Sequence, residues 1–339
     1  MRVLVTGATG FVGSWTAAAL LERGHEVRVL VRDEAKAARV LGRRGIDLAG
    51  VEVVVGDMLD AAVVARAVEG ADATVHCAAA IGVTSGGTVP VTEQNVGGTR
   101  TVVEAALAAG HDPVLHVSTI AVFVPPKEPV ITTESPLASP RNEYGRSKVE
   151  AERWLRGLQA DGRPVAIAYP GGVTGPDQPH LDAMQEGLAG ARRQGWPKAP
   201  GGVCIIDVRD LADALAAAVQ PGLGPRRLML GGNFFTWPAL GDLCDELTGV
   251  KARRVPFPKP VILAFAAFLD LVRRVRPVAY PLTRDAAEVM ITTVPTDDGP
   301  TLDALGITLR PSRETVETAL RWLAAEGHLA PELAGKLAP

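Results

Sequence analysis

The chain has 339 residues, of which 47% are hydrophobic and 22% are charged, and its formal net charge is −3. This composition is typical of a globular protein with a full core, arranged as one large domain or two moderate ones. The weak overall charge gives no electrostatic footprint for nucleic acid or for an anionic membrane. Three scattered cysteines and six dispersed histidines have no metal-ligand spacing, so we expect no metal site and a reduced, cytoplasmic protein.

The N-terminus starts directly with a strand pattern, and we therefore expect no signal peptide. The longest apolar run with a helical appearance covers residues 261–269. A membrane-spanning helix needs about 20 residues, so the sequence predicts no transmembrane segment.

Strand-like apolar runs alternate with helical patterns over the first two-thirds of the chain. The runs read RVLVTG (2–7), EVRVLV (26–31), VEVVVGD (51–57), DATVHCA (72–78), PVLHVST (113–119) and PVAIAYP (164–170). They are almost continuously apolar, which is typical of strands buried on both faces of a parallel sheet. The alternation predicts an α/β fold with a Rossmann-type, doubly wound sheet.

The pattern loosens after Pro170, where GGVTGPDQP forms a Gly/Pro-rich break. Residues 203–221 read as a strand and a helix that could rejoin the main sheet. We therefore predict a cofactor-binding Rossmann domain in residues 1–170, with 203–221 rejoining it. A smaller, mostly helical substrate-binding lobe would comprise 171–202 and 222–339.

A glycine-rich turn, VTGATGFVG, joins the first strand to the first helix. Such a turn lets the backbone approach a pyrophosphate, and the helix N-terminus supplies free N–H groups and a favourable dipole. A glycine pattern alone is weak evidence, but this one has the strand and helix context that the motif requires. The residues that we expect to contact a dinucleotide here are Gly7, Thr9, Gly10, Phe11 and Val12.

The end of the second strand selects the cofactor. An acidic residue at the strand tip would bind the ribose 2′-hydroxyl of NAD, but the tip is Val31, followed by Arg32. An arginine can pair with a 2′-phosphate, so NADP(H) is favoured over NAD(H). The alternative is that Arg32 is an ordinary exposed charge.

Two further strand ends contribute to the predicted cofactor site. After the third strand, Asp57 could accept a hydrogen bond from adenine with Met58 against the ring, although Asp57 could also cap a helix. After the fourth strand, Cys77, Ala78 and Ala79 are small enough to let the backbone pass beside the cofactor.

Tyr144 and Lys148 lie four residues apart in RNEYGRSKVE, which puts both on one face of a helix. An ammonium group beside a phenol favours the phenolate, so the pair is a plausible proton donor. An exposed helix with an unrelated Tyr and Lys would give the same spacing, and the surrounding motifs decide between the two.

Together the motifs TGATGFVG, GDMLD, HCAAA, NVGGTRTVVEAA, VSTIAVF, YGRSK, YPGGVTGP and DVRDLADAL resemble the extended short-chain dehydrogenase/reductase family over nearly the whole chain. Within it the chain looks most like the dihydroflavonol-reductase and 3β-hydroxysteroid-dehydrogenase branch. The resemblance implies that Tyr144 is the general acid/base, and that Lys148 holds the nicotinamide ribose and lowers the pKa of the tyrosine. It places Thr119 at the catalytic Ser/Thr position, with Ser118 as the weaker candidate.

The resemblance also assigns residues outside this triad. Asn95 would tie neighbouring strands together, and Pro170 and Val173 would lie against the nicotinamide. Nucleotide-sugar epimerases and dehydratases of the family usually carry an Asn that helps to bind the diphosphate, where this chain has Gly172. That departure disfavours sugar-nucleotide substrates.

The leading hypothesis is therefore an NADP(H)-dependent carbonyl reductase acting on a ketone or secondary alcohol of a fairly apolar small molecule. A nucleotide-sugar epimerase or dehydratase with bound NAD is one alternative, and a non-catalytic NADP(H)-binding sensor is another. We expect no nucleic-acid partner. The long helices at 95–109 and 142–158 resemble those that pair in family dimers, which predicts a homodimer.

The C-terminal lobe contains an apolar stripe at helical spacing within residues 259–276: Val261, Phe265, Phe268, Val272 and Val275. The ordinary interpretation is a helix packed on the core of the lobe. The alternatives are a wall of an apolar substrate pocket and a surface that touches a membrane. Trp237 and Tyr280 are possible substrate contacts by residue type alone.

Overall fold

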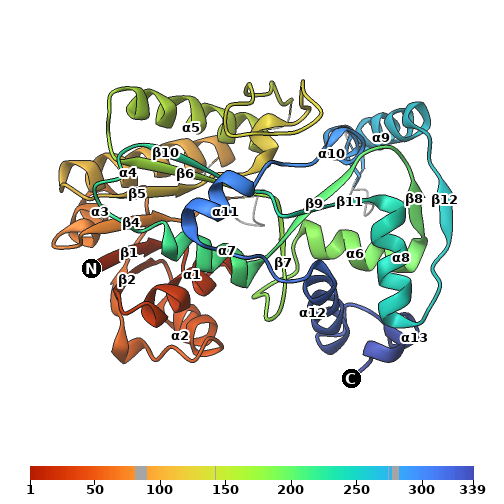
Figure 1. Ribbon diagram of the computed structural model, residues 1–339, viewed down its shortest axis with the longest axis horizontal. Coiled ribbons are helices and arrows are strands. Elements are labelled where there is room, and N and C mark those ends of the chain that lie inside the picture. The colour runs from red at the N-terminus through yellow and green to blue at the C-terminus, as the bar shows by residue number, and fades with distance from the viewer. Residues whose placement is uncertain (81–89, 142, 274, 277–281) are drawn as a thin grey trace.

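The computed structural model describes residues 1–80, 90–141, 143–273, 275–276 and 282–339. Tyr280 thus lies outside the described residues. In Figure 1, a parallel sheet layered between helices occupies one side of the molecule and a smaller lobe the other.

The main sheet has seven parallel strands in the order β10-β6-β5-β4-β1-β2-β3. Their bounds are β1 (Arg2–Thr6), β2 (Glu26–Val31), β3 (Glu52–Val55), β4 (Ala73–His76), β5 (Val114–Val117), β6 (Val165–Pro170) and β10 (Arg226–Leu230). The six predicted strands and the predicted Rossmann-type fold are confirmed. The order reverses between β1 and β4, and ligands of such sheets bind in the crevice at the carboxyl ends of the strands at this switch point.

Helices cover both faces of this sheet (Figure 1). One face carries α1 (Phe11–Glu22), α2 (Glu34–Gly42) and α7 (Val208–Ala217), and the other carries α3 (Ala61–Val68), α4 (Gly98–Ala108) and α5 (Glu143–Ala160). Short helical turns η1 (Leu48–Gly50), η2 (Glu93–Gly97) and η3 (Ile120–Phe123) join these elements. Each face packs its own apolar core against the strands, as expected for strands buried on both sides.

The segment 203–221 differs from our expectation. Its strand β9 (Gly202–Asp207) pairs with β7 (Gly172–Thr174) and β11 (Asn233–Thr236), outside the main sheet. Its helix α7 does join the main layer, where it packs against α1. The seventh strand of the sheet is β10, within residues that we had assigned to the lobe.

The lobe combines these three strands with a β8–β12 pair and several helices. The elements are α6 (Ala183–Gln194), β8 (Trp196–Lys198), α8 (Trp237–Thr248), β12 (Arg254–Pro256), α9 (Lys259–Arg273), α10 (Arg284–Thr292), α12 (Ser312–Ala325), α13 (Pro331–Ala334) and η4 (Gly335–Leu337). The remaining helix, α11 (Gly299–Leu305), packs against β10 and α7. The lobe has its own core, in which Trp196 and Leu240 are buried.

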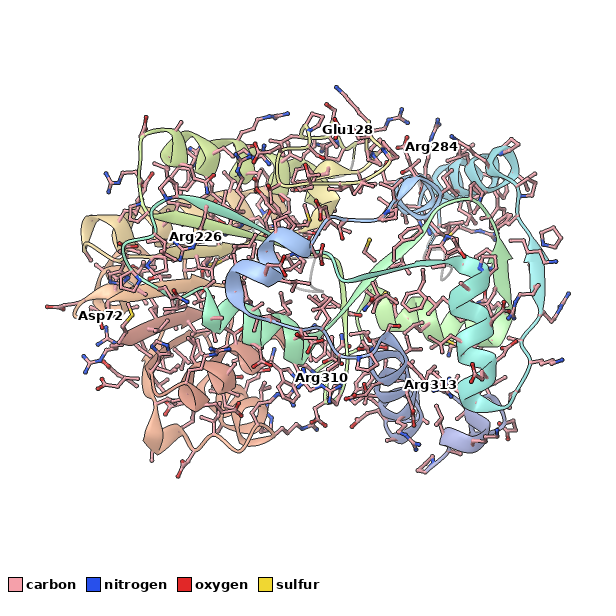
Figure 2. All side chains as sticks on the ribbon, viewed as in Figure 1. Asp72, Glu128, Arg226, Arg284, Arg310 and Arg313 are labelled. Carbon is pink, nitrogen blue, oxygen red and sulfur yellow. The ribbon has the colours of Figure 1, made fainter. Side chains whose placement is uncertain are left out.

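Arg310 connects the lobe to the Rossmann layer (Figure 2). Its backbone N–H donates to Oδ2 of Asp210 on α7 at 2.7 Å, and its guanidinium contacts Oδ1 of the same carboxylate. The segment that leads into α12 is thereby attached to α7.

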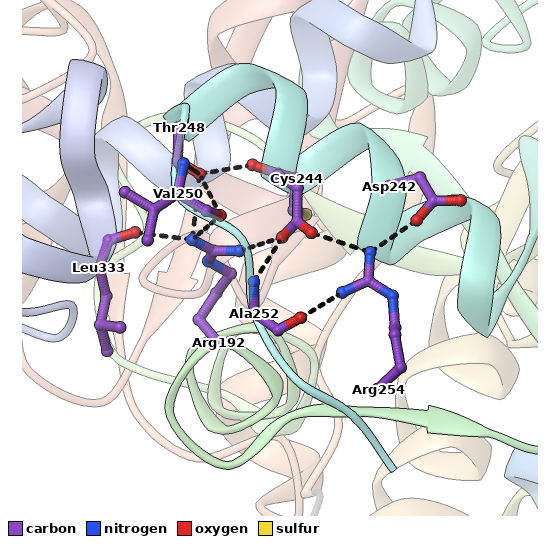
Figure 3. A network of polar contacts seen from close by, with 9 residues as sticks. Arg192, Asp242, Cys244, Thr248, Val250, Ala252, Arg254 and Leu333 are labelled. Carbon is purple, nitrogen blue, oxygen red and sulfur yellow. Dashed lines mark hydrogen bonds and ion pairs between the residues drawn. The ribbon is translucent and has the colours of Figure 1, made fainter. Parts of the chain in front are cut away.

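A buried arginine holds the lobe itself together (Figure 3). The side chain of Arg192 on α6 is fully buried and donates to Asp245 Oδ1 at 2.6 Å. It also donates to Thr248 Oγ1 and to the carbonyl oxygens of Val250 and Leu333, each at 3.0 Å. One guanidinium therefore joins α6, α8 and α13.

Helix α9 presents a different face to the lobe from the one predicted. Ile262, Ala266 and Leu269 are buried against Ala287 and Ile291 of α10. Val272 of the predicted stripe is partly buried. The other four stripe residues are exposed: Val261 (51%), Phe265 (39%), Phe268 (59%) and Val275 (87%). The helix is apolar on both sides, so periodicity alone could not show which stripe packs inward.

Among the described residues, no helix is both long enough and apolar enough to span a membrane.

Candidate active site

The turn between β1 and α1 is shaped for a close backbone approach. Gly7 has φ +75°, and a Cβ at that position would lie 2.7 Å from the backbone nitrogen of Ala78. A Cβ on Gly13 would collide with the carbonyl oxygen of Gly7. Gly10 is the N-cap of α1 and provides no side-chain hydrogen bond, so the first N–H groups of the helix stay available to an anion.

Arg32 lies just beyond the tip of β2, with its side chain 77% exposed and 3.9 Å from the carboxylate of Asp57. Asp33 is directed away from this point, because its Oδ1 caps α2 by accepting from Lys36 N–H at 2.9 Å. Asp57 accepts from Leu59 N–H at 3.0 Å, whereas the N-cap of α3 is Asp60. The helix-cap alternative for Asp57 is therefore wrong.

Tyr144 and Lys148 lie in the first turns of α5, as the spacing predicted. The Nζ of Lys148 is 3.4 Å from the carbonyl oxygen of Val117, the last residue of β5. The Lys148 side chain thus lies near the carboxyl edge of the sheet, the same edge as the glycine turn, and Tyr144 lies one helical turn before it on α5.

Asn95 fixes α5 against the segment that follows β4. Its side chain exchanges hydrogen bonds with the backbone of Ala80, at 2.7 Å and 3.0 Å, and donates to Ser147 Oγ at 3.0 Å. Ser147 in turn donates to the carbonyl oxygen of Tyr144 at 2.7 Å. The first turn of α5 is positioned by this chain of contacts.

The two hydroxyl groups after β5 have different partners. Ser118 is buried and donates its proton to Glu152 Oε2 at 3.1 Å. Thr119 Oγ1 accepts from the N–H of Ala121 at 3.2 Å, which leaves its own proton available for a substrate oxygen. This difference favours Thr119 over Ser118 as the donor.

Lys148 is buried among titratable side chains. Burial lowers its pKa to about 8, while Glu152 and Cys77 act in the opposite direction. Below it, burial lowers the pKa of His76 to about 3, with a smaller contribution from Lys148 itself, and His116 shifts in the same direction. Both histidines are therefore neutral at pH 7.

Glu152, one turn beyond Lys148, is a fully buried carboxylate that sequence reasoning missed. Besides Ser118, it accepts from the Tyr169 hydroxyl at 2.5 Å and from Arg156 Nε at 2.8 Å. Its i,i+4 spacing from Lys148 was the available signal, but the spacing does not reveal that the residue is buried.

The pKa of Tyr144 differs from the expectation. We expected Lys148 to lower it, but burial raises the pKa of the Tyr144 phenol to about 12. The cost of desolvating the phenolate dominates at this position.

The remaining predicted residues lie around the same edge. Pro170 ends β6, Val173 lies in β7, and Ala78 follows β4 and packs against the glycine turn. Met58 packs on α4, where a Cβ at Gly98 would meet its side chain. Trp237 is turned elsewhere, because its Nε1 donates to the carbonyl oxygen of Met290 in the lobe at 2.9 Å.

A seven-stranded parallel sheet, a glycine turn at its switch point and a Tyr/Lys pair at the same edge define a dinucleotide-binding α/β protein. The model of the NAD dependent epimerase/dehydratase family matches residues 3–231. The chain belongs to this family of extended short-chain dehydrogenases/reductases.

Its relatives have different activities. The chain is 29% identical to "Sterol demethylase protein B" of Methylococcus capsulatus, over 81% of this chain and 83% of that one. It is 31% identical to a UDP-glucose 4-epimerase of Azospirillum brasilense, over 75% and 79%. It is 26% identical to a protein of Synechocystis described as a candidate dihydroflavonol 4-reductase, over 96% and 95%.

The fold is shared with solved structures. A UDP-glucose-4-epimerase from Stenotrophomonas maltophila, with bound NAD and formylated UDP-arabinopyranose, superposes with a TM-score of 0.75 at 21% identity. The alignment covers 97% of this chain and 100% of that one.

Proposed function

We propose that the protein is an NADP(H)-dependent oxidoreductase that interconverts a ketone and a secondary alcohol in a fairly apolar small molecule. The observation that supports this proposal is that Lys148 and Thr119 lie at the carboxyl end of β5, with Tyr144 one turn before Lys148 on α5 and the Thr119 proton uncommitted. Family membership supports a cofactor-dependent reaction.

The residues present fit a dinucleotide. The glycine turn and the uncapped N-terminus of α1 would hold the pyrophosphate, because no Cβ or side-chain cap stands in the way. Arg32 would pair with the 2′-phosphate, and Asp57 would contact the adenine. Lys148 would hold the nicotinamide ribose, and Cys77, Ala79, Pro170 and Val173 would line the nicotinamide end.

The bound nicotinamide would supply or accept the hydride. The chain handles the charge that develops on the substrate oxygen. Tyr144 would donate a proton to it, and Thr119 would donate a hydrogen bond. Its pKa of about 12 keeps the Tyr144 phenol protonated, and hence able to donate, at pH 7.

Two observations favour an apolar substrate over a sugar nucleotide. A Cβ at Gly172 would lie 3.1 Å from both the Cys204 carbonyl oxygen and Met184 Sδ, so an Asn side chain at this position would have to displace its neighbours slightly. The relatives also include proteins named as a sterol demethylase component and as a 3-beta-hydroxysteroid dehydrogenase. The UDP-glucose 4-epimerase relative supports a sugar-nucleotide activity with bound NAD as the second candidate.

The test is a fluorescence titration of the purified protein with NADPH and with NADH, repeated on Arg32→Ala. Loss of a charged hydrogen-bond pair costs about 1.5–3 kcal/mol, which corresponds to a loss of roughly 10- to 100-fold in NADPH affinity. NADH affinity should not change, and Arg153→Ala, an exposed arginine on α5, should affect neither cofactor. Equal binding of both cofactors by the wild type would refute the NADP(H) assignment.

Reduction of a panel of apolar ketones with the preferred cofactor tests the reaction. Tyr144→Phe should lower kcat by about 10²–10⁴-fold with little change in cofactor affinity. An unchanged kcat would remove Tyr144 from the chemistry. Binding of UDP- or dTDP-sugars with copurified NAD would establish the second candidate instead.

We also propose a homodimer that pairs through α4 and α5, which sedimentation velocity would detect.

A further inference from the structure

Among the described residues, large exposed apolar side chains are concentrated on α9, directly after it and on α10. Of the ten exposed large hydrophobic residues among those described, six lie here: Val261, Phe265, Phe268, Leu271, Val275 and Val289. Leu271 and Phe268 are each 59% exposed, and Val275 is 87% exposed. We call these six residues the α9 face. Large exposed apolar side chains gathered on one part of a surface are a candidate interaction site.

The α9 face is not the side of α9 that packs against the lobe. Ile262, Ala266 and Leu269 already bury the opposite side of α9 against α10. On the outer side, Phe265 contacts the ring of Phe257, with 6.1 Å between the ring centroids, whereas Phe268 and Leu271 are each 59% exposed. An α-helix that is apolar all round is ordinarily buried all round, so this exposure is unusual. Figure 1 shows α9 at the outer edge of the lobe, away from the main sheet.

The charges on and near the α9 face are mainly cationic. Residues 251–290 contain eight Lys/Arg and three Asp/Glu, although the whole chain is acidic. The exposed charged residues among those described on α9, on α10 and directly after α9 are all cationic: Lys259, Arg276 and Arg284. Asp270 is partly buried and paired with Arg273, and Asp285 and Glu288 are partly buried.

The cations lie at the ends of the apolar stripe. Lys259 begins α9, two residues before Val261, and Arg276 directly follows Val275. Arg284 begins α10, beside α9 at the edge of the molecule (Figure 2). An apolar helix face flanked by Lys and Arg is the arrangement of helices that lie in a membrane interface, with the apolar side among the acyl chains and the cations at the phosphates.

We propose that the α9 face docks the protein peripherally on an anionic phospholipid membrane. The weak overall charge of the chain conceals this site, because the excess of acidic residues lies elsewhere. The lobe that carries the proposed substrate site would then face the lipid phase in which apolar compounds dissolve. The docking itself does not depend on the proposed reaction.

The test is co-sedimentation with vesicles of phosphatidylcholine alone and of phosphatidylcholine mixed with phosphatidylglycerol. We expect binding to the anionic vesicles that is about tenfold or more above that to neutral ones, and that weakens as salt is raised. The double variant Phe268→Asp/Leu271→Asp should abolish binding. The charge variant Lys259→Glu/Arg284→Glu should remove the preference for anionic lipid.

The matched control is Leu223→Asp, because Leu223 is 57% exposed but lies outside the α9 face. It should bind vesicles like the wild type. Circular dichroism and thermal melts establish whether each variant is folded. We expect all of them to fold, because each substitution replaces an exposed side chain.

Wild-type protein that binds neither vesicle type, or a Phe268→Asp/Leu271→Asp variant that binds like the wild type, would overturn the proposal. A second copy of the chain on the α9 face would also overturn it. In that case the double variant would lower the sedimentation coefficient without lipid, whereas a dimer through α4 and α5 would be unaffected.

Discussion

Asp245→Ala tests how the lobe is held together. The substitution removes the carboxylate that faces Arg192, whose side chain is fully buried on α6. Three neutral oxygens, from Thr248, Val250 and Leu333, would remain around the guanidinium. Arg254 keeps Asp242 as a partner at 2.6 Å, so the cost falls mainly on Arg192.

Removing one partner of a buried ion pair costs about 3–5 kcal/mol, and we expect this loss in the free energy of unfolding. Arg192→Met should cost less, about 1–3 kcal/mol, because Asp245 loses Arg192 but keeps Arg254 and the N–H of Ala252, and the other acceptors that lose a donor are neutral. The double variant leaves no orphaned charge. It should therefore be about 2 kcal/mol more stable than the sum of the single losses predicts.

The matched control is Glu246→Ala, one residue along α8. Glu246 forms an exposed ion pair with Arg313 at 2.7 Å, and such pairs contribute about 0–1 kcal/mol. Urea unfolding followed by tryptophan fluorescence suits the measurement, because Trp196 and Trp322 are buried in the same lobe core. Additive losses in the Arg192/Asp245 cycle, or a Glu246→Ala loss as large as that of Asp245→Ala, would refute the reasoning.

Two other substitutions test the cofactor edge. Glu152 raises the pKa of Lys148, so Glu152→Gln should lower that pKa. The ammonium form of Lys148 is lost as pH rises through its pKa, which is about 8 in the wild type, so the alkaline limb of kcat/KM should move to lower pH. An unmoved limb would show that Glu152 does not control the charge of Lys148. Gly13→Ala should destabilise the fold and weaken cofactor binding, because its Cβ would collide with the Gly7 carbonyl oxygen. Gly187→Ala within α6 has open space and should stabilise by up to about 1 kcal/mol, so equal effects in thermal melts would argue against a steric cause.

Most of the sheet could be predicted from sequence because six of its strands are nearly continuous apolar runs. The seventh, β10, begins with two arginines and follows a long excursion into the lobe, so nothing local linked it to the main sheet. Its pairing with β6 is a long-range contact.

The site was predictable to the extent that motifs fix residue types and spacing. The positions of Tyr144, Lys148 and the glycine turn followed from short motifs. The buried state of Glu152 and the raised pKa of Tyr144 did not, since both depend on desolvation by residues distant in sequence. The outward stripe of α9 was misassigned because the helix is apolar on both sides, and only its packing against α10 shows which side faces inward.

The late position of β10 means that the two parts of this protein are not interchangeable modules. Residues 1–170 alone would end with β6 as a bare edge strand, its N–H and C=O groups open to pairing with another chain. The excursion through β7, α6, β8, β9 and α7 must be threaded before β10 can cover that edge, and α11 then packs over it. A swap of the lobe for that of a relative at residue 170 would therefore cut the sheet itself, and a workable exchange has to carry its own version of β10.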